Sequence, residues 1–489
     1  MDLLRLLQIA LPGVAAPRGS DRIVIDAVTD DSRRVKPGSL FVAVHGTRSD
    51  GHEFVGPAVA AGAVAVVVQR QVESIGVPGI VVNDSRWALA RLAATISGLD
   101  AIQAAGWLRA VGVTGTNGKT TTSYLVRDVL RHAGHTVGLL GTVAYDLVSQ
   151  RLAAPLTTPP PTELCQHLVA AAHAGADWAV LEASSHALDQ RRLAGVALDV
   201  GIFTNITRDH SDYHSKLSDY MAAKRRLFEQ VRPEGVAILN ADTPASLHMA
   251  SACRGRVIGY GINAAAEVAA RIERIDSTGS RFELHYGEKV LAVCMPLVGK
   301  HNISNALAAA AVGWALGIEP EVVVAALESP TLVPGRLQRV GAGDRDIEVF
   351  VDYAHTDDAL DNVLSCLRQV TEGRLRVVFG CGGDRDRTKR PLMGQVAARR
   401  ADVLYVTSDN PRTESPQAII DEILGGIDDA DRPRTHVEPD RRAAIAAALG
   451  EAAAGDVVLI AGKGHETHQV VGTERRPFDD VAVAAEVLR

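Results

Sequence analysis

The chain has 489 residues, of which 47% are hydrophobic, 22% are charged and only 4% are aromatic. At roughly 150 residues per domain this length predicts about three domains, and the mixed charges argue against disorder. The net charge is −7 and no basic block stands out, so nucleic acid is not expected as the main partner. No run of about 20 apolar residues is available to cross a membrane, and a monomer is the default expectation.

The cysteine pattern points to a reduced compartment. The five cysteines are scattered, odd in number and form no C-x-x-C pair. We therefore expect a cytoplasmic protein in which each thiol is a small buried side chain. The cysteines are Cys165, Cys253, Cys294, Cys366 and Cys381.

The start of the chain, MDLLRLLQIALPGVAAP, has the look of a signal peptide. However, Asp2 stands where a basic region is expected, and Arg5 interrupts the apolar run. Leucine recurs at helical spacing, so a short amphipathic helix is the better prediction.

Three zones follow one another along the chain. Residues 1–100 hold short apolar runs, SLFVAV, AVAVVV and GIVV, which are typical of a small α/β domain. Residues 101–330 hold the longer buried strands LRAVGVTG, WAVLEASS, VGIFTNIT and VAILNAD. An alternating segment, RFELHYGEKVLAVCMPL, then predicts a β-hairpin that turns at Gly287, and a helix is expected at about 303–316.

Residues 331–489 contain four apolar strands within IEVFVDYAH, LRVVFGCGGDRD, DVLYVTSDNPR and DVVLIAGKGHE. Each strand ends in a polar or glycine-bearing cluster. In an open parallel sheet these clusters lie along one edge, where ligands bind. Four such clusters favour function over ordinary loop chemistry.

The segment VGVTGTNGKTTTSYLV, residues 111–126, resembles a phosphate-binding loop. Val113 occupies the position of the usual first glycine, but a strand, a glycine turn, Lys119 and Thr120 at a helix start remain. Backbone N–H groups and the helix N-terminus can hold phosphate oxygens, Lys119 adds a cation, and Thr120 can bind Mg²⁺. A nucleotide site is therefore favoured over a plain strand–helix turn.

Other polar residues follow the central strands. Glu182 ends an apolar strand, where its carboxylate would lie near the loop and could hold magnesium. His210 lies in TNITRDHSDYH, a stretch too polar for a core. Spacing alone gives Lys224, Arg225 and Arg226 no more than a solvated helix face.

Seven motifs occur in order: GTNGKTTT, LEASSH, TNITRDHSDYH, KHNISNALAA, PGRLQ, DYAHTDDAL and GKGHE. Together they resemble the Mur ligases over nearly the whole chain, and the departure at Val113 is normal for that family. The segments DDSRRVKPGSLFVAVHG and TSDNPR narrow the resemblance to members that add diaminopimelate. The expected fold is α/β with three domains: a small N-terminal UDP-substrate domain, a central P-loop ATPase-like parallel sheet with a β-hairpin extension, and a Rossmann-like, doubly wound C-terminal domain.

The resemblance implies an ATP-dependent ligase of peptidoglycan precursor synthesis. It would add meso-diaminopimelate to the D-Glu carboxylate of UDP-MurNAc-L-Ala-D-Glu through an acyl phosphate. ATP and two Mg²⁺ ions are the implied cofactors. Lys119, His210 and carbamylated Lys224 are the implied catalytic groups, with Thr120, Glu182, Lys224 and His210 around the metals. ATP would contact Gly115, Thr116, Asn117, Gly118, Lys119, Thr120, Thr121, Asn305, Arg336 and Asp352.

The resemblance also implies two further binding sets. Domain closure would bring Arg336 and Asp352 to the nucleotide. In the LTTP segment, Leu156 replaces an asparagine found in many members, so only its backbone is expected to contribute. The nucleotide-sugar peptide would use Asp30, Ser32, Thr47, Arg48, Ser49, Thr157, Thr158, Ser184, Gln190 and Arg192. Diaminopimelate would use Arg385, Asp409, Asn410, Pro411, Arg412, Gly462 and Glu466.

Two alternatives remain at this level. A folylpolyglutamate synthase shares the loop and the central fold, but it lacks a comparable N-terminal domain. A nucleotide switch or binding protein would leave the four C-terminal clusters unexplained.

Overall fold

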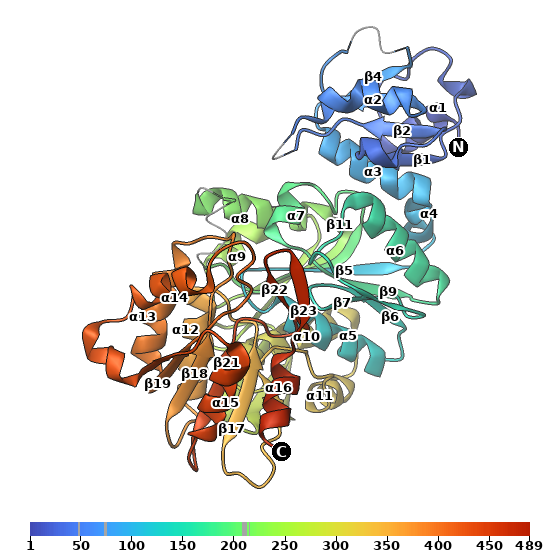
Figure 1. Cartoon of the computed structure of the whole chain (residues 1–489). Helices are drawn as coiled ribbons and strands as arrows, with labels where there is room; N and C mark the ends of the chain where they lie inside the picture. Colours follow the sequence, from blue (N-terminus) through green and yellow to red (C-terminus); the bar gives the residue numbers. More distant parts are fainter. Residues whose placement is uncertain (47–48, 73–75, 208–212, 215) are drawn as a thin grey trace.

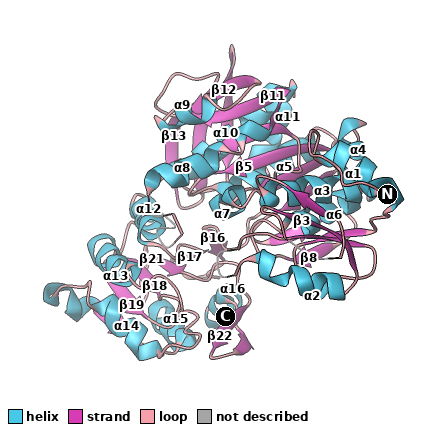
Figure 2. Cartoon of the chain, turned by 90° about the horizontal axis from the view of Figure 1, so that it is seen from above, coloured by secondary structure: helices cyan, strands magenta, loops and turns pink. Residues whose placement is uncertain are grey.

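Three main β-sheets, each covered by helices, follow one another along the chain (Figure 1). The computed structural model describes residues 1–46, 49–72, 76–207, 213–214 and 216–489. The views in Figure 1 and Figure 2 place the N-terminal and third units apart from each other, each against the central unit. The predicted α/β class with three units is confirmed.

The N-terminal unit is a parallel sheet in the order β1-β2-β3-β4. Asp2 caps the first helix by accepting a hydrogen bond from the backbone N–H of Arg5 (2.8 Å), so the predicted amphipathic helix is confirmed. Apolar side chains are buried on both faces of the sheet. The elements are α1 (Leu3–Ala10), β1 (Ala27–Thr29), β2 (Ser39–Val42), α2 (Val55–Ala60), β3 (Ala63–Val68), β4 (Gly79–Val81), α3 (Ser85–Ser97) and α4 (Leu99–Ala104).

The central unit has an 11-stranded sheet in the order β15-β14-β13-β12-β11-β10-β5-β9-β6-β7-β8. Its middle strands are parallel and buried on both faces, as their continuous runs of apolar residues predict. The strands are β5 (Arg109–Thr114), β6 (Val137–Leu140), β7 (Ala144–Asp146), β8 (Arg151–Ala153), β9 (Trp178–Glu182), β10 (Leu198–Phe203), β11 (Val231–Asn240), β12 (Arg256–Gly261), β13 (Val268–Asp276), β14 (Gly279–Tyr286) and β15 (Lys289–Met295). The helices are α5 (Lys119–His132), α6 (Pro161–His173), α7 (Ser185–Asp189), α8 (Leu217–Arg225), α9 (Ala245–Ala250), α10 (Lys300–Leu316) and α11 (Pro320–Glu328).

The predicted hairpin and the helix after it are both present. Tyr286 of β14 pairs with Lys289 of β15, and the turn contains Gly287 at φ 61°. The helix, α10, begins three residues before its expected start and ends where expected.

The third unit is a six-stranded sheet in the order β16-β17-β21-β18-β19-β20. The four predicted strands, β17, β18, β19 and β21, are all parallel, so their polar ends meet at one edge as expected. The strands are β16 (Gln338–Val340), β17 (Glu348–Asp352), β18 (Leu375–Phe379), β19 (Val403–Val406), β20 (Thr435–Val437) and β21 (Val457–Ala461), with a separate hairpin of β22 (His468–Val471) and β23 (Glu474–Pro477). The helices are α12 (Asp357–Arg368), α13 (Lys389–Arg400), α14 (Pro416–Leu424), α15 (Arg441–Gly450) and α16 (Asp480–Val487).

Two expectations from the sequence are wrong. Lys224 is 1% exposed rather than part of a solvated face. Cys294 is exposed because it lies on the outer face of the β14–β15 hairpin, and Cys253 is half-buried, whereas the other three cysteines are buried. All five thiols are free. In the described part of the chain, no helix is both long and apolar enough to span a bilayer.

Candidate active site

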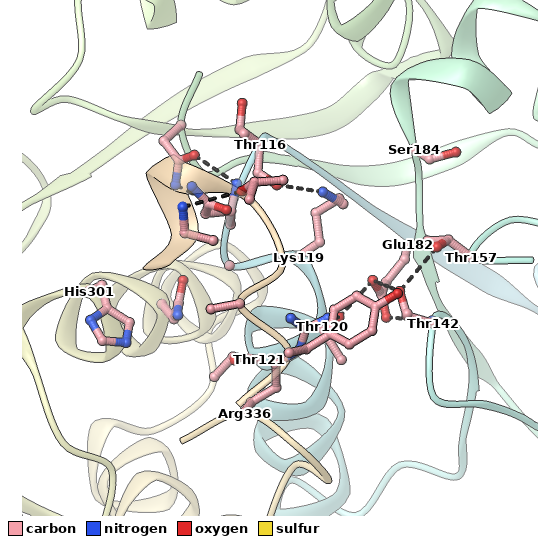
Figure 3. A pocket seen from close by; sticks show the side chains of 18 of the residues that line it. Thr116, Lys119, Thr120, Thr121, Thr142, Thr157, Glu182, Ser184, His301 and Arg336 are labelled. Atoms are coloured by element: carbon pink, nitrogen blue, oxygen red, sulfur yellow. Dashed lines mark hydrogen bonds between the residues drawn. The ribbon is translucent and has the colours of Figure 1, made fainter. Parts of the chain in front are cut away.

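A cavity of about 680 Å³ lies between the central and third units (Figure 3). Its walls come from the loop after β5, the C-terminal end of β9, the first turns of α10 and the segment after β17. It brings together many of the residues that the sequence singled out. These are Thr116, Asn117, Gly118, Lys119, Thr120, Thr121, Thr157, Thr158, Glu182, Ser184, Arg192, Lys224, Asn305, Arg336 and Asp352.

Two lysine side chains donate hydrogen bonds to the Gly115 carbonyl of the phosphate-loop segment. Gly115 has φ 153°, and a Cβ there would collide with Thr204 Oγ1, so the tight turn requires glycine. Lys119 Nζ donates to the carbonyl oxygens of Gly115 (2.9 Å) and Thr116 (2.7 Å). Lys224 Nζ donates to the same Gly115 oxygen at 2.7 Å and lies 4.2 Å from the centre of the Tyr220 ring. Two ammonium groups therefore meet directly behind the loop.

Glu182 is 1% exposed at the end of β9 and faces the first turn of α5. Its Oε2 accepts from Thr120 Oγ1 at 3.0 Å and from Thr142 Oγ1 at 2.9 Å, and its Oε1 accepts from the Thr142 N–H at 2.9 Å. The arrangement offers carboxylate and hydroxyl oxygens, which are the ligands that a hard cation prefers.

Arg336 enters the cavity from the segment that joins the central and third units. Its Nη2 donates to Thr120 Oγ1 at 3.1 Å, and its guanidinium lies 4.8 Å from the centre of the Tyr353 ring. Its Nε is buried and has no hydrogen-bond partner among the described residues. A buried, unsatisfied N–H is costly, so this donor is suited to an anionic ligand.

Asn305 and Asp352 are both buried beside the loop, but each also has a structural role. Asn305 Oδ1 accepts from Thr122 Oγ1 at 3.2 Å. Asp352 accepts from the backbone N–H groups of Leu337 (2.7 Å) and Ala354 (2.8 Å), which fixes the turn that carries Arg336. Burial raises the pKa of Asp352, and the nearby Arg336 opposes that shift.

The far side of the cavity holds the residues expected around the muramoyl peptide. Thr158 Oγ1 donates to the Glu182 carbonyl at 2.6 Å and accepts from the Ser184 N–H at 3.2 Å. Arg192 donates to the Thr158 carbonyl at 2.7 Å and to Gln190 Oε1 at 2.8 Å. These bonds connect this group to the backbone of Glu182 at the end of β9.

Other predicted residues lie away from the cavity. Asp30 lies near enough to Arg192 for their charges to interact, whereas Ser32 and Ser49 do not line the cavity. Thr47, Arg48 and His210 lie outside the described residues.

The residues expected to bind diaminopimelate gather in a second cluster at the carboxyl edge of the third sheet. A Cβ at Gly382 would lie 2.9 Å from Arg412 Nη1, 3.8 Å from Arg385 Cγ and 3.8 Å from the Asn410 carbonyl oxygen. Asn410 Nδ2 donates to Glu466 Oε2 at 2.7 Å. Arg412 has φ 51°, and its Nη1 donates to the Gly383 carbonyl at 2.7 Å. Asp409, Pro411 and Gly462 belong to the same loops.

Four residues of these clusters were missed from the sequence. Tyr353 contacts Arg336 and lies 5.1 Å, ring to ring, from His465 of the GKGHE loop, so it joins the two clusters. Thr142 follows β6, and Asp358 accepts from Asn117 Nδ2 across the unit boundary at 2.8 Å. Lys463 is the lysine of GKGHE. The position of each after a strand or at a helix start was the signal available.

Three family patterns match successive parts of the chain. They are described as the Mur ligase family, catalytic domain (residues 24–96), the Mur ligase middle domain (113–313) and the Mur ligase, glutamate ligase domain (335–464). A UDP-N-acetylmuramoyl-L-alanyl-D-glutamate–2,6-diaminopimelate ligase from Syntrophomonas wolfei is 44% identical over 468 residues, which cover 95% of each chain. The chain belongs to the Mur ligase family.

Comparison of structures agrees with this family. A solved UDP-N-acetylmuramoyl-L-alanyl-D-glutamate–2,6-diaminopimelate ligase matches 100% of this chain and 98% of its own, with 33% identity and a TM-score of 0.71. The Mycobacterium tuberculosis folylpolyglutamate synthase complexed with ADP matches 81% of this chain and 93% of its own, with 20% identity and a TM-score of 0.60. The second likeness concerns the fold alone. As a member of the Mur ligase family, the chain is an ATP-dependent ligase of peptidoglycan precursor synthesis.

Proposed function

We propose that this ligase adds meso-diaminopimelate to the D-Glu carboxylate of UDP-MurNAc-L-Ala-D-Glu. A carboxylate oxygen attacks the γ-phosphorus of ATP, the bond to the β-phosphate breaks, and ADP leaves. The amine of diaminopimelate then attacks the acyl carbon and loses a proton. A C–N bond forms, the C–O bond to phosphate breaks, and inorganic phosphate leaves with one oxygen from the peptide.

The observation that carries this proposal is the composition of the cavity between the units. Lys119, Thr120 and Arg336 supply donors for phosphate, and Thr158 and Arg192 line the same cavity. The curated relative at 44% identity bears the name of this activity over 95% of both chains. A site that holds a carboxylate against a γ-phosphate needs positioning and charge neutralisation, not a covalent nucleophile.

The donor set fits magnesium. Thr120 Oγ1 and Thr142 Oγ1 both donate to Glu182 Oε2, and all three are hard oxygen ligands. Thr120 and Glu182 would hold one ion, while Lys224, as a carbamate, and His210 would surround a second. When bound, Mg²⁺ neutralises charge that develops on the transferred phosphate.

The second cluster would select the amino acid. Arg412 and Arg385 can each hold a carboxylate with two N–H groups, and Asp409, Asn410 and Glu466 can accept from ammonium groups. Meso-diaminopimelate carries a second carboxylate and a second amine, whereas lysine lacks the extra carboxylate. The charges of this cluster therefore support diaminopimelate as the substrate. We also infer a cytoplasmic monomer that acts on small molecules.

The function is tested by measuring ADP release from the purified chain under three conditions. We expect release only when UDP-MurNAc-L-Ala-D-Glu and meso-diaminopimelate are both present, and little with ATP alone or with a folate plus glutamate. With ¹⁸O in the D-Glu carboxylate, the label should appear in the released phosphate. Folate-dependent release, or phosphate without label, would refute the proposal.

A further inference from the structure

A lysine that the proposed reaction does not use is completely buried in the GKGHE loop. Lys463 is 0% exposed and follows β21. Its Nζ donates to the carbonyl oxygen of His468 at 2.6 Å, to Glu466 Oε2 at 3.1 Å and to Asn410 Oδ1 at 3.3 Å. A buried ammonium is stable only when it is paired and hydrogen-bonded, and here it is bonded three times.

Glycines on both sides of Lys463 turn it inward. Gly462 has φ 113°, and a Cβ there would lie 2.6 Å from Asp409 Oδ2. Gly464 has φ 53°, and a Cβ there would lie 2.7 Å from Tyr353 Cβ. The loop can therefore press against the end of β19 on one side and the segment after β17 on the other. This close approach places the lysine between Asn410 and Glu466.

Three hydrogen bonds, from Val470 to Asn410, from Asn410 to Glu466 and from Lys463 to Glu466, fix the Asn410 amide and the Glu466 carboxylate relative to each other. Asn410 Oδ1 accepts from the Val470 N–H at 2.9 Å, which fixes the oxygen end of the amide, and Nδ2 donates to Glu466 Oε2 at 2.7 Å. Lys463 Nζ donates to that same Oε2. Among the residues that the structure describes, both hydrogen bonds to the Glu466 carboxylate end on Oε2, so Oε1 can accept from a ligand.

We propose that Lys463 is a positioning residue for amino-acid selection, which holds Asn410 and Glu466 in the arrangement that receives an ammonium group of the diaminopimelate substrate. This inference rests on the proposed function. It assigns to Lys463 no contact with ATP or with the reacting carboxylate. Its loss should therefore weaken binding of the amino acid and leave the nucleotide site intact.

The test compares Lys463→Met, which removes the donor and the charge, with Lys463→Gln, which keeps a neutral N–H donor on a side chain one atom shorter. We expect Lys463→Met to raise the KM for diaminopimelate about tenfold or more, because a charge-assisted hydrogen bond is lost. Lys463→Gln should raise it less. The KM for ATP should change by less than about twofold in both, which corresponds to under about 0.5 kcal/mol.

Arg376 supplies a matched control in the same unit. It is a buried cation paired with Asp456 at 2.8 Å, at the start of β18 and hence at the opposite end of the sheet. Arg376→Met should lower the melting temperature but leave the KM for diaminopimelate unchanged. An unchanged KM in Lys463→Met would overturn the inference. So would failure of both Lys463 variants to fold while Arg376→Met folds, because the lysine would then serve folding alone.

The pH dependence of the KM for diaminopimelate distinguishes a positioning role of Lys463 from a general loss of structure in the loop. Burial alone would raise the pKa of Glu466, but Lys463 and the hydrogen bonds from Asn410 and Lys463 outweigh it and hold that pKa below its usual range. His465 on the loop, Arg441 of α15 and Tyr353 after β17 also face this carboxylate. Without Lys463 the carboxylate should take up a proton at higher pH.

As the pH is lowered, the KM for diaminopimelate should therefore begin to rise at a higher pH in Lys463→Met than in the wild type. A rise that begins at the same pH in both proteins would overturn the inference. The wild-type control separates this failure from a failure of the proposed function. If the unaltered chain shows no diaminopimelate-dependent ADP release, the function itself is wrong.

Discussion

At the scale of single residues, Lys224 is the clearest case of a side chain whose environment differs from what its sequence context suggests. The sequence around Lys224 predicts a solvated helix face. Its ammonium group is instead buried and shares the Gly115 carbonyl oxygen with Lys119. As an ammonium group, Lys224 would only repeat the role of Lys119, which is to place a positive charge beside the phosphates. Carbamylation, as the family resemblance implies, would instead give Lys224 anionic oxygens that suit a hard metal.

The two roles of Lys224 predict different mutant behaviour. If a carbamate is needed, Lys224→Ala and Lys224→Arg should each lower kcat by about a hundredfold or more, because arginine keeps the cation but cannot supply the carbamate oxygens. Added bicarbonate should not restore Lys224→Ala, whereas acetate or propionate should restore it in part. ADP release measures each outcome. Near-normal turnover of Lys224→Arg would show that a cation is sufficient.

At the scale of elements, the start of α12 is joined to the phosphate loop. Asp358 Oδ2 accepts from Asn117 Nδ2 at 2.8 Å and from Thr207 Oγ1 at 2.9 Å. Asn117 is in turn held by Asn205, whose Oδ1 accepts the Asn117 backbone N–H at 2.9 Å. A helix of the third unit thereby fixes part of the loop that would surround the ATP phosphates.

Asp357 offers a matched control for this contact, because both acids lie in the first turn of α12. Replacing either by alanine removes a charge that favours the helix N-terminus, and Asp358→Ala also removes the hydrogen bonds to Asn117 and Thr207, so it should lose more thermal stability than Asp357→Ala. Only Asp358→Ala should lower kcat/KM for ATP, by about tenfold, since hydrogen bonds to a carboxylate are lost. Equal kinetic losses in the two variants would contradict a specific role for Asp358.

At the scale of the whole molecule, the sequence predicts the order and type of the main elements. The longer buried strands were predicted because burial on both faces leaves an unbroken run of apolar residues in the sequence. The short strands β7 and β8, at one end of the central sheet, were missed, since three residues carry too little periodicity. The bonds from Thr142 to Glu182 and from Asn117 to Asp358 join residues 40 and 241 positions apart. The first pair depends on which strands become neighbours in the central sheet and the second on how the central and third units pack, and no local pattern encodes either.

The pH dependence of stability also belongs to the whole molecule, because shifted groups occur in separate units. Burial, with Arg336 nearby, lowers the pKa of His465 to about 4 from 6.5. Hydrogen bonds from His52 lower the pKa of Asp50 to about 2, and those from Arg390 do the same for Glu414. In each case the unfolded chain takes up its proton at a higher pH than the folded chain.

The free energy of unfolding should therefore fall as the pH falls, because stability rises with pH wherever the unfolded state binds more protons. His465 acts between about pH 6.5 and 4, and the two carboxylates act from about pH 4 down to 2. Urea unfolding at pH 7, 5 and 3.5 should show a decline in both intervals. His465→Gln should flatten the first interval and make the decline in the second smaller, because His465 still contributes between pH 5 and about 4. An equal slope between pH 7 and 5 in both proteins would mean that other groups control stability there.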